Sequence, residues 1–152
     1  VEEARPDFHA RHHAASRSYL YQISTRRTAF AKKHVWWVKD LLDVQVMAAA
    51  AERLVGRHDF AAFSMRNPSR PDESTIVVVE AAEIVVDLPP LPPAVALVLL
   101  GIVGALVEVG RRKLSVEDFA ALLEGKGREV ASLTAPPSGL FLARIEYQKR
   151  RT

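Results

Sequence analysis

The sequence predicts an α+β domain with a mixed, mainly antiparallel sheet and about three helices packed on it. Alternating patterns near both ends of the chain and β-branched runs in its middle indicate strands. Three other stretches carry apolar residues at helical spacing or helix-capping residues, which indicate helices. The length of 152 residues, of which 49% are hydrophobic and 26% charged, fits one domain over residues 1–152 that buries a core.

The first expected strand covers residues 17–24, after an extended segment that begins near Phe8. Alternate side chains of a strand share a face, so Arg17, Tyr19 and Tyr21 are expected on one side. Two interpretations follow. The tyrosines could be strand aromatics that pack in a core, which residue chemistry alone favours because strands are rich in aromatic residues. Alternatively, the guanidinium holds a phosphate while a ring stacks on a base.

The first expected helix follows Asp43, which is a suitable N-cap, and covers residues 44–55 before Gly56 ends it. Its apolar stripe has helical spacing and consists of Val44, Met47, Ala48, Ala51 and Val55. Further along, the β-branched runs at 75–79 and 83–86 predict one or two strands, and their unbroken apolar character predicts burial on both faces.

A second helix is expected at residues 94–109, after a proline-rich stretch that interrupts any strand ladder. These sixteen residues are nearly all apolar, and they are fewer than the roughly twenty needed to span a bilayer. We therefore predict a buried central helix rather than a membrane helix. Gly101 and Gly104 are expected to mark close approach of another backbone to this helix.

The last two elements are a helix that begins after Ser115 and ends near Gly125, and a strand at 140–147. Alternation along this strand predicts two faces. The first carries Leu140, Leu142, Arg144 and Glu146. The second is more apolar and is the expected buried face, with Phe141, Ala143, Ile145 and Tyr147.

Charge and cysteine content restrict the kind of protein. The chain has no cysteine, which excludes a disulfide framework and thiolate chemistry. Its charged first residues do not form a secretory signal, so we expect the cytoplasm or an organelle interior (mitochondrion or plastid). The net charge is +3, and residues 1–35 hold seven Lys or Arg against three Asp or Glu. Basic ends suit a polyanion, most often RNA, although a solvated charged face would explain the same numbers.

Three histidines, His9, His12 and His13, raise the idea of a metal site. No acidic or cysteine partner stands near them, so surface or RNA-contacting histidines are the favoured interpretation. A serine–histidine pairing pattern and a glycine-rich phosphate loop are also absent from the sequence. A metal site at these histidines is therefore the less favoured interpretation.

Four stretches, taken together, resemble a known family, the TruA-type tRNA pseudouridine synthases. They occur in the family's order and at close to its spacing, from about Phe8 to Tyr147: FHARHHAASRSYLY, LVGRHDFAAF, IVGALVEVG and TAPPSGLFLARIEY. The resemblance is to the C-terminal half of such an enzyme, so it implies a pseudouridine-synthase-like half domain.

The resemblance implies isomerisation of uridine to pseudouridine in the anticodon arm of tRNA, without cofactor or metal. A nucleophilic aspartate would act on the uridine, and the base would reattach through carbon. Tyr19 matches the family's active-site tyrosine in an R-x-Y-x-Y pattern, and it would supply a flat surface for the flipped base. The expected partners are tRNA, with rRNA as the alternative RNA, and further copies in a homodimer or larger assembly. No membrane partner is expected.

Candidate RNA contacts come from the same N-terminal region. Arg11, in the HAR motif, and Arg17 follow from the resemblance. The other candidates are donors of the basic first segment and its loop, namely His9, Arg26, Arg27, Lys32 and Lys33. With the resemblance, the basic and aromatic groups around Tyr19 are interpreted as functional.

The sequence departs from the family pattern at several places. The G-R-T-D-x-G-V-H-A motif that carries the aspartate is absent, and Leu100 stands where the family's V-R-N has an arginine thought to pair with it. The proline-rich run replaces an expected strand, and Ser74 and Gly127 replace a usual arginine and aspartate. A buried carboxylate without its cation has a raised pKa and a smaller nucleophilic fraction. Two hypotheses remain: the C-terminal part of a working synthase, or a degenerate, non-catalytic RNA-binding relative such as a ribonucleoprotein component.

Overall fold

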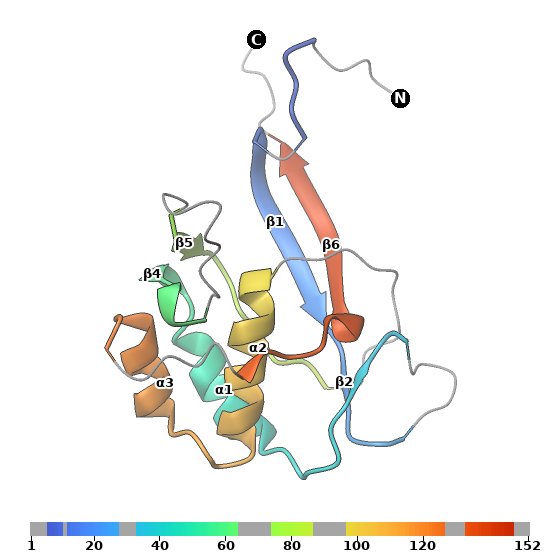
Figure 1. Ribbon diagram of the computed structural model, residues 1–152, viewed down its shortest axis with the longest axis vertical. Helices are drawn as coiled ribbons and strands as arrows, with labels where there is room; N and C mark the ends of the chain where they lie inside the picture. The colour runs from blue at the N-terminus through green and yellow to red at the C-terminus, as the bar shows by residue number, and fades with distance from the viewer. Residues whose placement is uncertain are drawn as a thin grey trace.

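The computed structural model describes residues 6–10, 12–27, 33–63, 74–86, 97–126 and 133–147. It confirms the predicted α+β class, because this part of the chain holds three α-helices together with short strand pairs. The helices form a body from which a long two-stranded ribbon rises (Figure 1). In chain order, the helices and strands are β1 (Ala14–Tyr21), β2 (Ile23–Ser24), β3 (Trp36–Trp37), α1 (Val44–Glu52), β4 (Gly56–Asp59), β5 (Ile76–Val79), α2 (Leu97–Gly110), α3 (Val116–Leu123) and β6 (Leu140–Tyr147).

The strands pair in a mixed, mainly antiparallel manner, as predicted. β1 pairs antiparallel with β6 and β4 antiparallel with β5, whereas β2 and β3 are parallel. Within the described residues they form three separate two-stranded sheets instead of the one sheet that the sequence suggested. The first strand also begins at Ala14, earlier than expected, and it stops at Tyr21. Gln22 leaves the ladder there, donating its N–H to the carbonyl of Gly139 at 2.8 Å, and β2 then pairs with β3.

The two capped helices begin where the sequence predicts. The Asp43 carboxylate accepts the N–H of Val46 at 3.1 Å, and the Ser115 hydroxyl accepts that of Asp118 at 2.9 Å. The Val46 N–H and then the Arg112 guanidinium hold the pKa of Asp43 below its usual range. Helix α1 ends at Glu52, before the expected Val55, because its last turn tightens into bonds between residues three apart.

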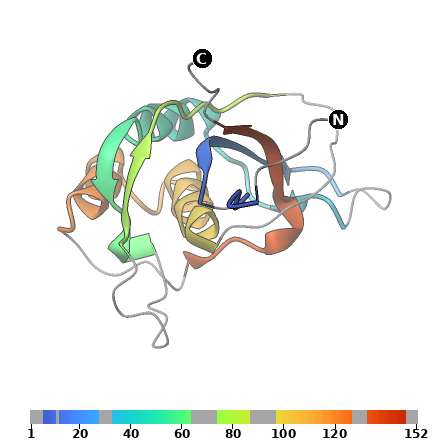
Figure 2. The same cartoon turned by 90° about the horizontal axis from the view of Figure 1, so that it is seen from above.

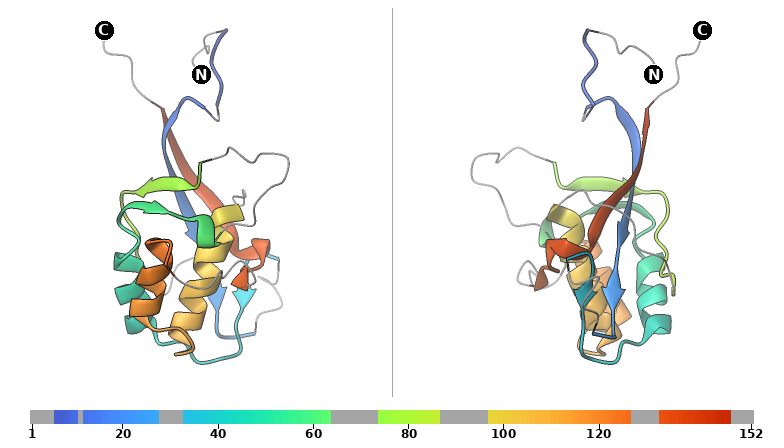
Figure 3. Two further views of the ribbon diagram at one scale, coloured as in Figure 1. Left: turned by 60° about the vertical axis from the view of Figure 1, so that its left-hand side comes forward. Right: turned by 90° about the vertical axis from the view of Figure 1, so that its right-hand side faces the viewer.

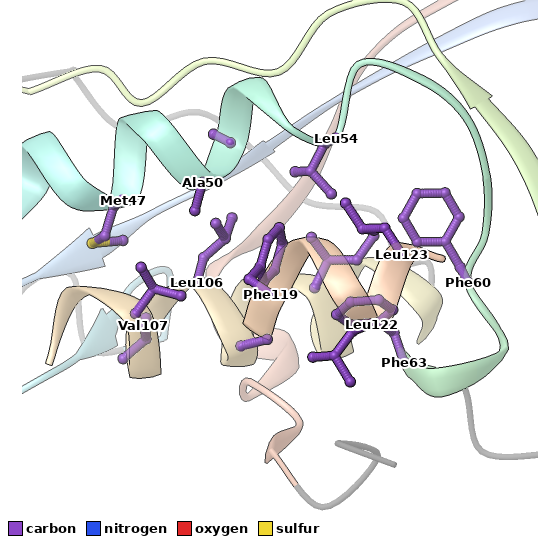
Figure 4. Packing of buried hydrophobic residues seen from close by; sticks show 14 of the residues in the cluster. Met47, Ala50, Leu54, Phe60, Phe63, Leu106, Val107, Phe119, Leu122 and Leu123 are labelled. Carbon is purple, nitrogen blue, oxygen red and sulfur yellow. The ribbon is translucent and has the colours of Figure 1, made fainter. Parts of the chain in front are cut away.

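Helix α2 is the buried central helix that the sequence predicts. Seen from above, it lies between the α1 and α3 helices on one side and the β1–β6 ribbon on the other (Figure 2). The core clusters around it, and the side chains labelled in Figure 4 come from α1, α2, α3, the turn after α1 and the segment after β4. The labelled ones are Met47, Ala50, Leu54, Phe60, Phe63, Leu106, Val107, Phe119, Leu122 and Leu123. Among the described helices, none is both long and apolar enough to cross a membrane.

Two glycines of α2 allow neighbouring backbone to touch the helix, as predicted. A Cβ added to Gly101 would lie 2.2 Å from the carbonyl oxygen of Phe63. A Cβ added to Gly104 would lie 1.4 Å from the carbonyl oxygen of Leu133. The second contact holds the segment that leads into β6 directly against the central helix.

Replacing Gly104 by Ala should therefore destabilise the protein. In an ordinary helix this change stabilises by about 1 kcal/mol, because glycine is a poor helix former. Here the new methyl group must displace the backbone of Leu133, and we expect the free energy of unfolding to fall by about 2–3 kcal/mol. Chemical denaturation measures the difference, with Ala121→Gly on α3 as the control for propensity alone. An equally or more stable Gly104→Ala variant would contradict the close packing.

The predicted burial of the β-branched runs is wrong. The side chains of Ile76, Val77 and Val78 are exposed, with Val78 at 63%. Residues 83–86 form no strand, and Val85 and Val86 are also exposed. The reason is that β5 pairs only with β4 among the described residues. This strand pair lies across one end of the helices and not between two layers of structure (Figure 3).

The prediction that one face of β6 is buried is also wrong beyond the second residue of the strand. Leu140 and Phe141 are both buried, although they point to opposite faces, whereas Ile145 and Tyr147 are exposed. The pairing explains part of this result: Ser18 lies opposite Arg144 but Tyr19 lies opposite Leu142, so Ala143 is an extra residue that breaks the alternation. Burial instead follows distance along the ribbon, because only its first residues lie beside the helical body (Figure 1).

Candidate active site

Tyr19 lies where three distant parts of the chain meet. The β1–β6 ladder places it opposite Leu142, two positions from the pair formed by Tyr21 and Leu140. Its half-buried side chain packs against a small apolar cluster made of Leu100 from α2, Ala135 from the segment before β6, and Leu140 from β6. The fold therefore fixes one side of the Tyr19 ring through β1, α2 and β6 together.

Leu100 is the residue that most distinguishes this site. Its side chain is only 2% exposed, and its carbonyl accepts the N–H of Ala135 at 2.9 Å. That bond ties the first turns of α2 to the segment before β6. Leu99 and Val103 pack against the same cluster. The position that the sequence singled out as a missing cation thus belongs to the cluster against which the candidate catalytic tyrosine packs, in surroundings that are apolar among the described residues.

Both tyrosines pack against the cluster of Leu100, Ala135 and Leu140, as the core interpretation predicts, and Tyr21 is held by further contacts. Its hydroxyl donates to the carbonyl oxygen of Pro136 at 2.5 Å, and its ring meets Trp36 edge-on at a centroid distance of 6.3 Å. Burial raises the pKa of Tyr21 further above its ordinary value of 10.0, so the phenol stays protonated at any ordinary pH. The ring also fits closely against Gly139, where a Cβ would lie 2.7 Å from it.

Arg17 is exposed and lies opposite Ile145, one alternate position from Tyr19 along β1. This spacing matches the expectation that a guanidinium and a ring share one face of the strand. An RNA contact by Arg17 stays a prediction.

The basic loop after β2 is partly described. The Ser24 hydroxyl donates to the carbonyl of Arg26 at 2.6 Å and accepts its N–H at 3.3 Å, which fixes the turn. The Arg27 guanidinium lies over the ring of Trp37, 5.3 Å from its centroid. Arg26, Arg27 and Lys33 are exposed. The candidates Arg11 and Lys32 lie outside the described residues.

The candidate His9 belongs to a group of rings near the start of β1. Its ring is 4.4 Å from that of His12, and its N–H donates to Nδ1 of His13 at 2.9 Å. Phe8 packs against Tyr147 at the end of β6, with 5.0 Å between ring centroids. No metal-binding group of three or more ligands occurs among the residues that the structure describes.

Sequence reasoning missed Trp37. The signal was available, because Trp36 and Trp37 are adjacent in an extended stretch, and alternation must turn one of them outward. In the structure Trp36 packs inward against Tyr21, and Trp37 is exposed beside Arg27.

Comparison with known proteins agrees with the motifs. The family model described as tRNA pseudouridine synthase matches residues 101–148. The chain is 36% identical to tRNA pseudouridine synthase A of Bartonella tribocorum over an alignment of 157 residues. The alignment covers 97% of this chain and 62% of the relative. The protein of the same name from Exiguobacterium sp. is 35% identical over 160 residues, covering 98% of this chain and 62% of the relative. The chain belongs to the TruA-type tRNA pseudouridine synthase family.

This family member spans less than two thirds of the length of those relatives. The same holds for the relative from Paramagnetospirillum magneticum, which is 35% identical, with 93% of this chain and 57% of the relative covered. The family model covers α2 from residue 101 to its end and the whole of β6. It begins one residue after Leu100, where the sequence leaves the family's V-R-N pattern.

Proposed function

We propose that residues 1–152 are the C-terminal half domain of a tRNA pseudouridine synthase that isomerises uridine in the anticodon arm. The observation that carries this proposal is the meeting of Tyr19, Leu100 and Leu140 in one cluster. Longer family members that match nearly the whole of this chain are named tRNA pseudouridine synthase A, which supports it. The catalytic aspartate would come from a part of the gene product that contains an R-T-D motif.

In this proposal Tyr19 holds the base while its bond to the sugar changes. The aspartate carboxylate attacks C1′ and displaces N1. After the base turns, C5 attacks C1′ and displaces the carboxylate, the proton on C5 leaves to water, and N1 gains a proton, so the product is an isomer of uridine. The detached base must stay in place between these two events. The Tyr19 ring, backed by Leu100 and Leu140, offers it a flat and rigid surface.

RNA would be held by the exposed cations of the same region. Arg17 lies along β1 from Tyr19, and Arg26, Arg27, Lys33 and His9 are further exposed donors. Arg11 and Lys32 complete the proposed set from the sequence. We propose tRNA as the partner, with rRNA as the alternative, in a homodimer or larger assembly. A location in the cytoplasm or an organelle interior stays a prediction.

A second candidate function is RNA binding without chemistry. The observation that favours it is Leu100, which puts a buried apolar side chain where a cation is expected to hold the aspartate ionised. This alternative predicts RNA affinity that falls steeply as salt concentration rises, because phosphate contacts release counterions.

One assay separates the two functions. The complete gene product is first mapped by intact mass and peptide mapping, to find whether an R-T-D peptide precedes Val1. It is then incubated with tRNA that carries tritium at C5 of uridine, because bond formation at C5 releases that hydrogen to water. Release of tritium supports the synthase, whereas salt-dependent binding without release supports the RNA-binding relative. Neither binding nor release would overturn both.

A further inference from the structure

Trp37 is an exposed indole held in one place by its neighbours. Its side chain is 44% exposed, although it belongs to a strand of only two residues. The residues on either side of it point inward: Trp36 packs against Tyr21, and Val38 is fully buried in the core. The backbone is fixed by two hydrogen bonds, from the N–H of Trp36 to Gln22 and from the N–H of Val38 to Ser24, at 3.0 and 2.9 Å. The indole therefore projects from a rigid base.

A cation already lies against this ring. The Arg27 guanidinium is 5.3 Å from the ring centroid, within the range of a cation–π interaction. Ser24, which pairs with Trp37 in the ladder, also closes the turn that leads to Arg27. The two side chains are thus positioned by the same short parallel pair.

The surroundings of Trp37 are basic. Arg26 is exposed at the same turn, and Lys39 is exposed at the alternate position after Trp37. The nearest acid in sequence, Asp40, is engaged by Arg111, whose Nε lies 2.7 Å from its carboxylate. A rigid exposed ring among cations is the arrangement that proteins use to bind single-stranded nucleic acid, because the ring stacks on a base and the cations neutralise phosphates.

We propose that Trp37 and Arg27 form a second base-stacking site for single-stranded RNA, separate from Tyr19. The inference rests on the proposed function, because it assigns a further contact to the same RNA. An unpaired base would stack on the indole, and Arg27 would hold a neighbouring phosphate. The site takes single-stranded RNA of any sequence, since every base has a π face.

The test uses Trp37 as its own reporter. Trp36→Phe keeps an aromatic ring against Tyr21 and leaves Trp37 as the sole tryptophan of the chain. The fluorescence of Trp37 is followed in the chain of residues 1–152 as an oligouridylate strand is added. The titration is repeated with a strand of the same length whose sugars carry no bases. Stacking should quench the fluorescence with the first strand and leave it nearly unchanged with the second.

Affinity measurements complete the test. Trp37→Ala should weaken binding of oligouridylate roughly 5- to 100-fold and leave binding of the base-free strand unchanged. Trp37→Phe should retain most of the affinity, and Arg27→Ala should weaken binding of both strands. Leu41→Ala is the matched control, because it removes an apolar side chain that is 94% exposed. It should change the affinity for neither strand.

Two results would overturn the inference while leaving the proposed function intact. The first is unchanged oligouridylate binding by Trp37→Ala in a chain whose unsubstituted form binds RNA. The second is an equal loss for both strands, which would mean that Trp37 only positions the basic loop. If the unsubstituted chain binds no RNA at all, the proposed function and the inference fail together.

Discussion

Replacing Tyr19 by Ala in the complete gene product should lower the conversion of uridine in tRNA by roughly 100-fold or more. The substitution removes the ring that the cluster of Leu100, Ala135 and Leu140 holds in place, so a detached base would lose its backing surface. The measurement is tritium release from C5-labelled tRNA under single-turnover conditions, which reports the chemical steps and not product release.

Folding has to be separated from chemistry in this experiment, because Tyr19 is half-buried. Tyr19→Phe keeps the ring and its packing, and it should keep most of the turnover if stacking is the role of the side chain. Thermal unfolding of both variants shows whether the fold survives. Full activity of a folded Tyr19→Ala variant would remove Tyr19 from the mechanism.

Replacing Leu100 by Arg should lower the stability of the described chain, but it should raise turnover in a gene product that supplies the aspartate. In the chain of 152 residues the new cation would be buried among apolar side chains, and the free energy of unfolding should fall by about 3–5 kcal/mol. Leu100→Met, which nearly conserves volume, should cost less than about 1.5 kcal/mol. Chemical denaturation measures both changes.

In a gene product that carries the R-T-D motif, the same arginine would face a carboxylate. The cation would lower the pKa of that carboxylate and increase its ionised fraction at neutral pH, so turnover should rise roughly 10-fold and the loss of stability should shrink. Leu106→Arg is the control, because Leu106 is buried on the same helix in the main core. Equal losses of turnover in the two variants would show that position 100 does not face the aspartate.

Several features of this protein could be predicted from the sequence because they depend on neighbours within a few residues. Asp43 and Ser115 cap helices where expected, since capping is decided within one turn. The apolar run of α2 is buried, since it has no polar face to present to water. Gly101 and Gly104 mark backbone contacts for the same reason, because small residues in such a helix leave room for close packing.

For the candidate site, the motif order identified Tyr19 and Leu100, but nothing in their spacing showed that Tyr19 packs against a cluster that contains Leu100. This arrangement depends on the register of β1 with β6 and on the hydrogen bond from Ala135 to Leu100. The bulge at Ala143 and the exposed ends of the ribbon depend on the same long-range pairing. Trp37 likewise became a candidate only when the β2–β3 pair placed Arg27 over it.

The sequence by itself determined the α+β class, the helix starts, the central helix and the family. Only the tertiary structure decided which strand faces are covered and which distant segments the tyrosine rings pack against. The physical reason is that local hydrogen bonding and apolar pattern are written in adjacent residues, whereas burial of a strand face depends on segments far away in the chain. Tyr19 and Tyr21 illustrate this dependence, because both pack against the cluster of Leu100, Ala135 and Leu140, and the Tyr21 hydroxyl also bonds to Pro136 more than a hundred residues away in the chain.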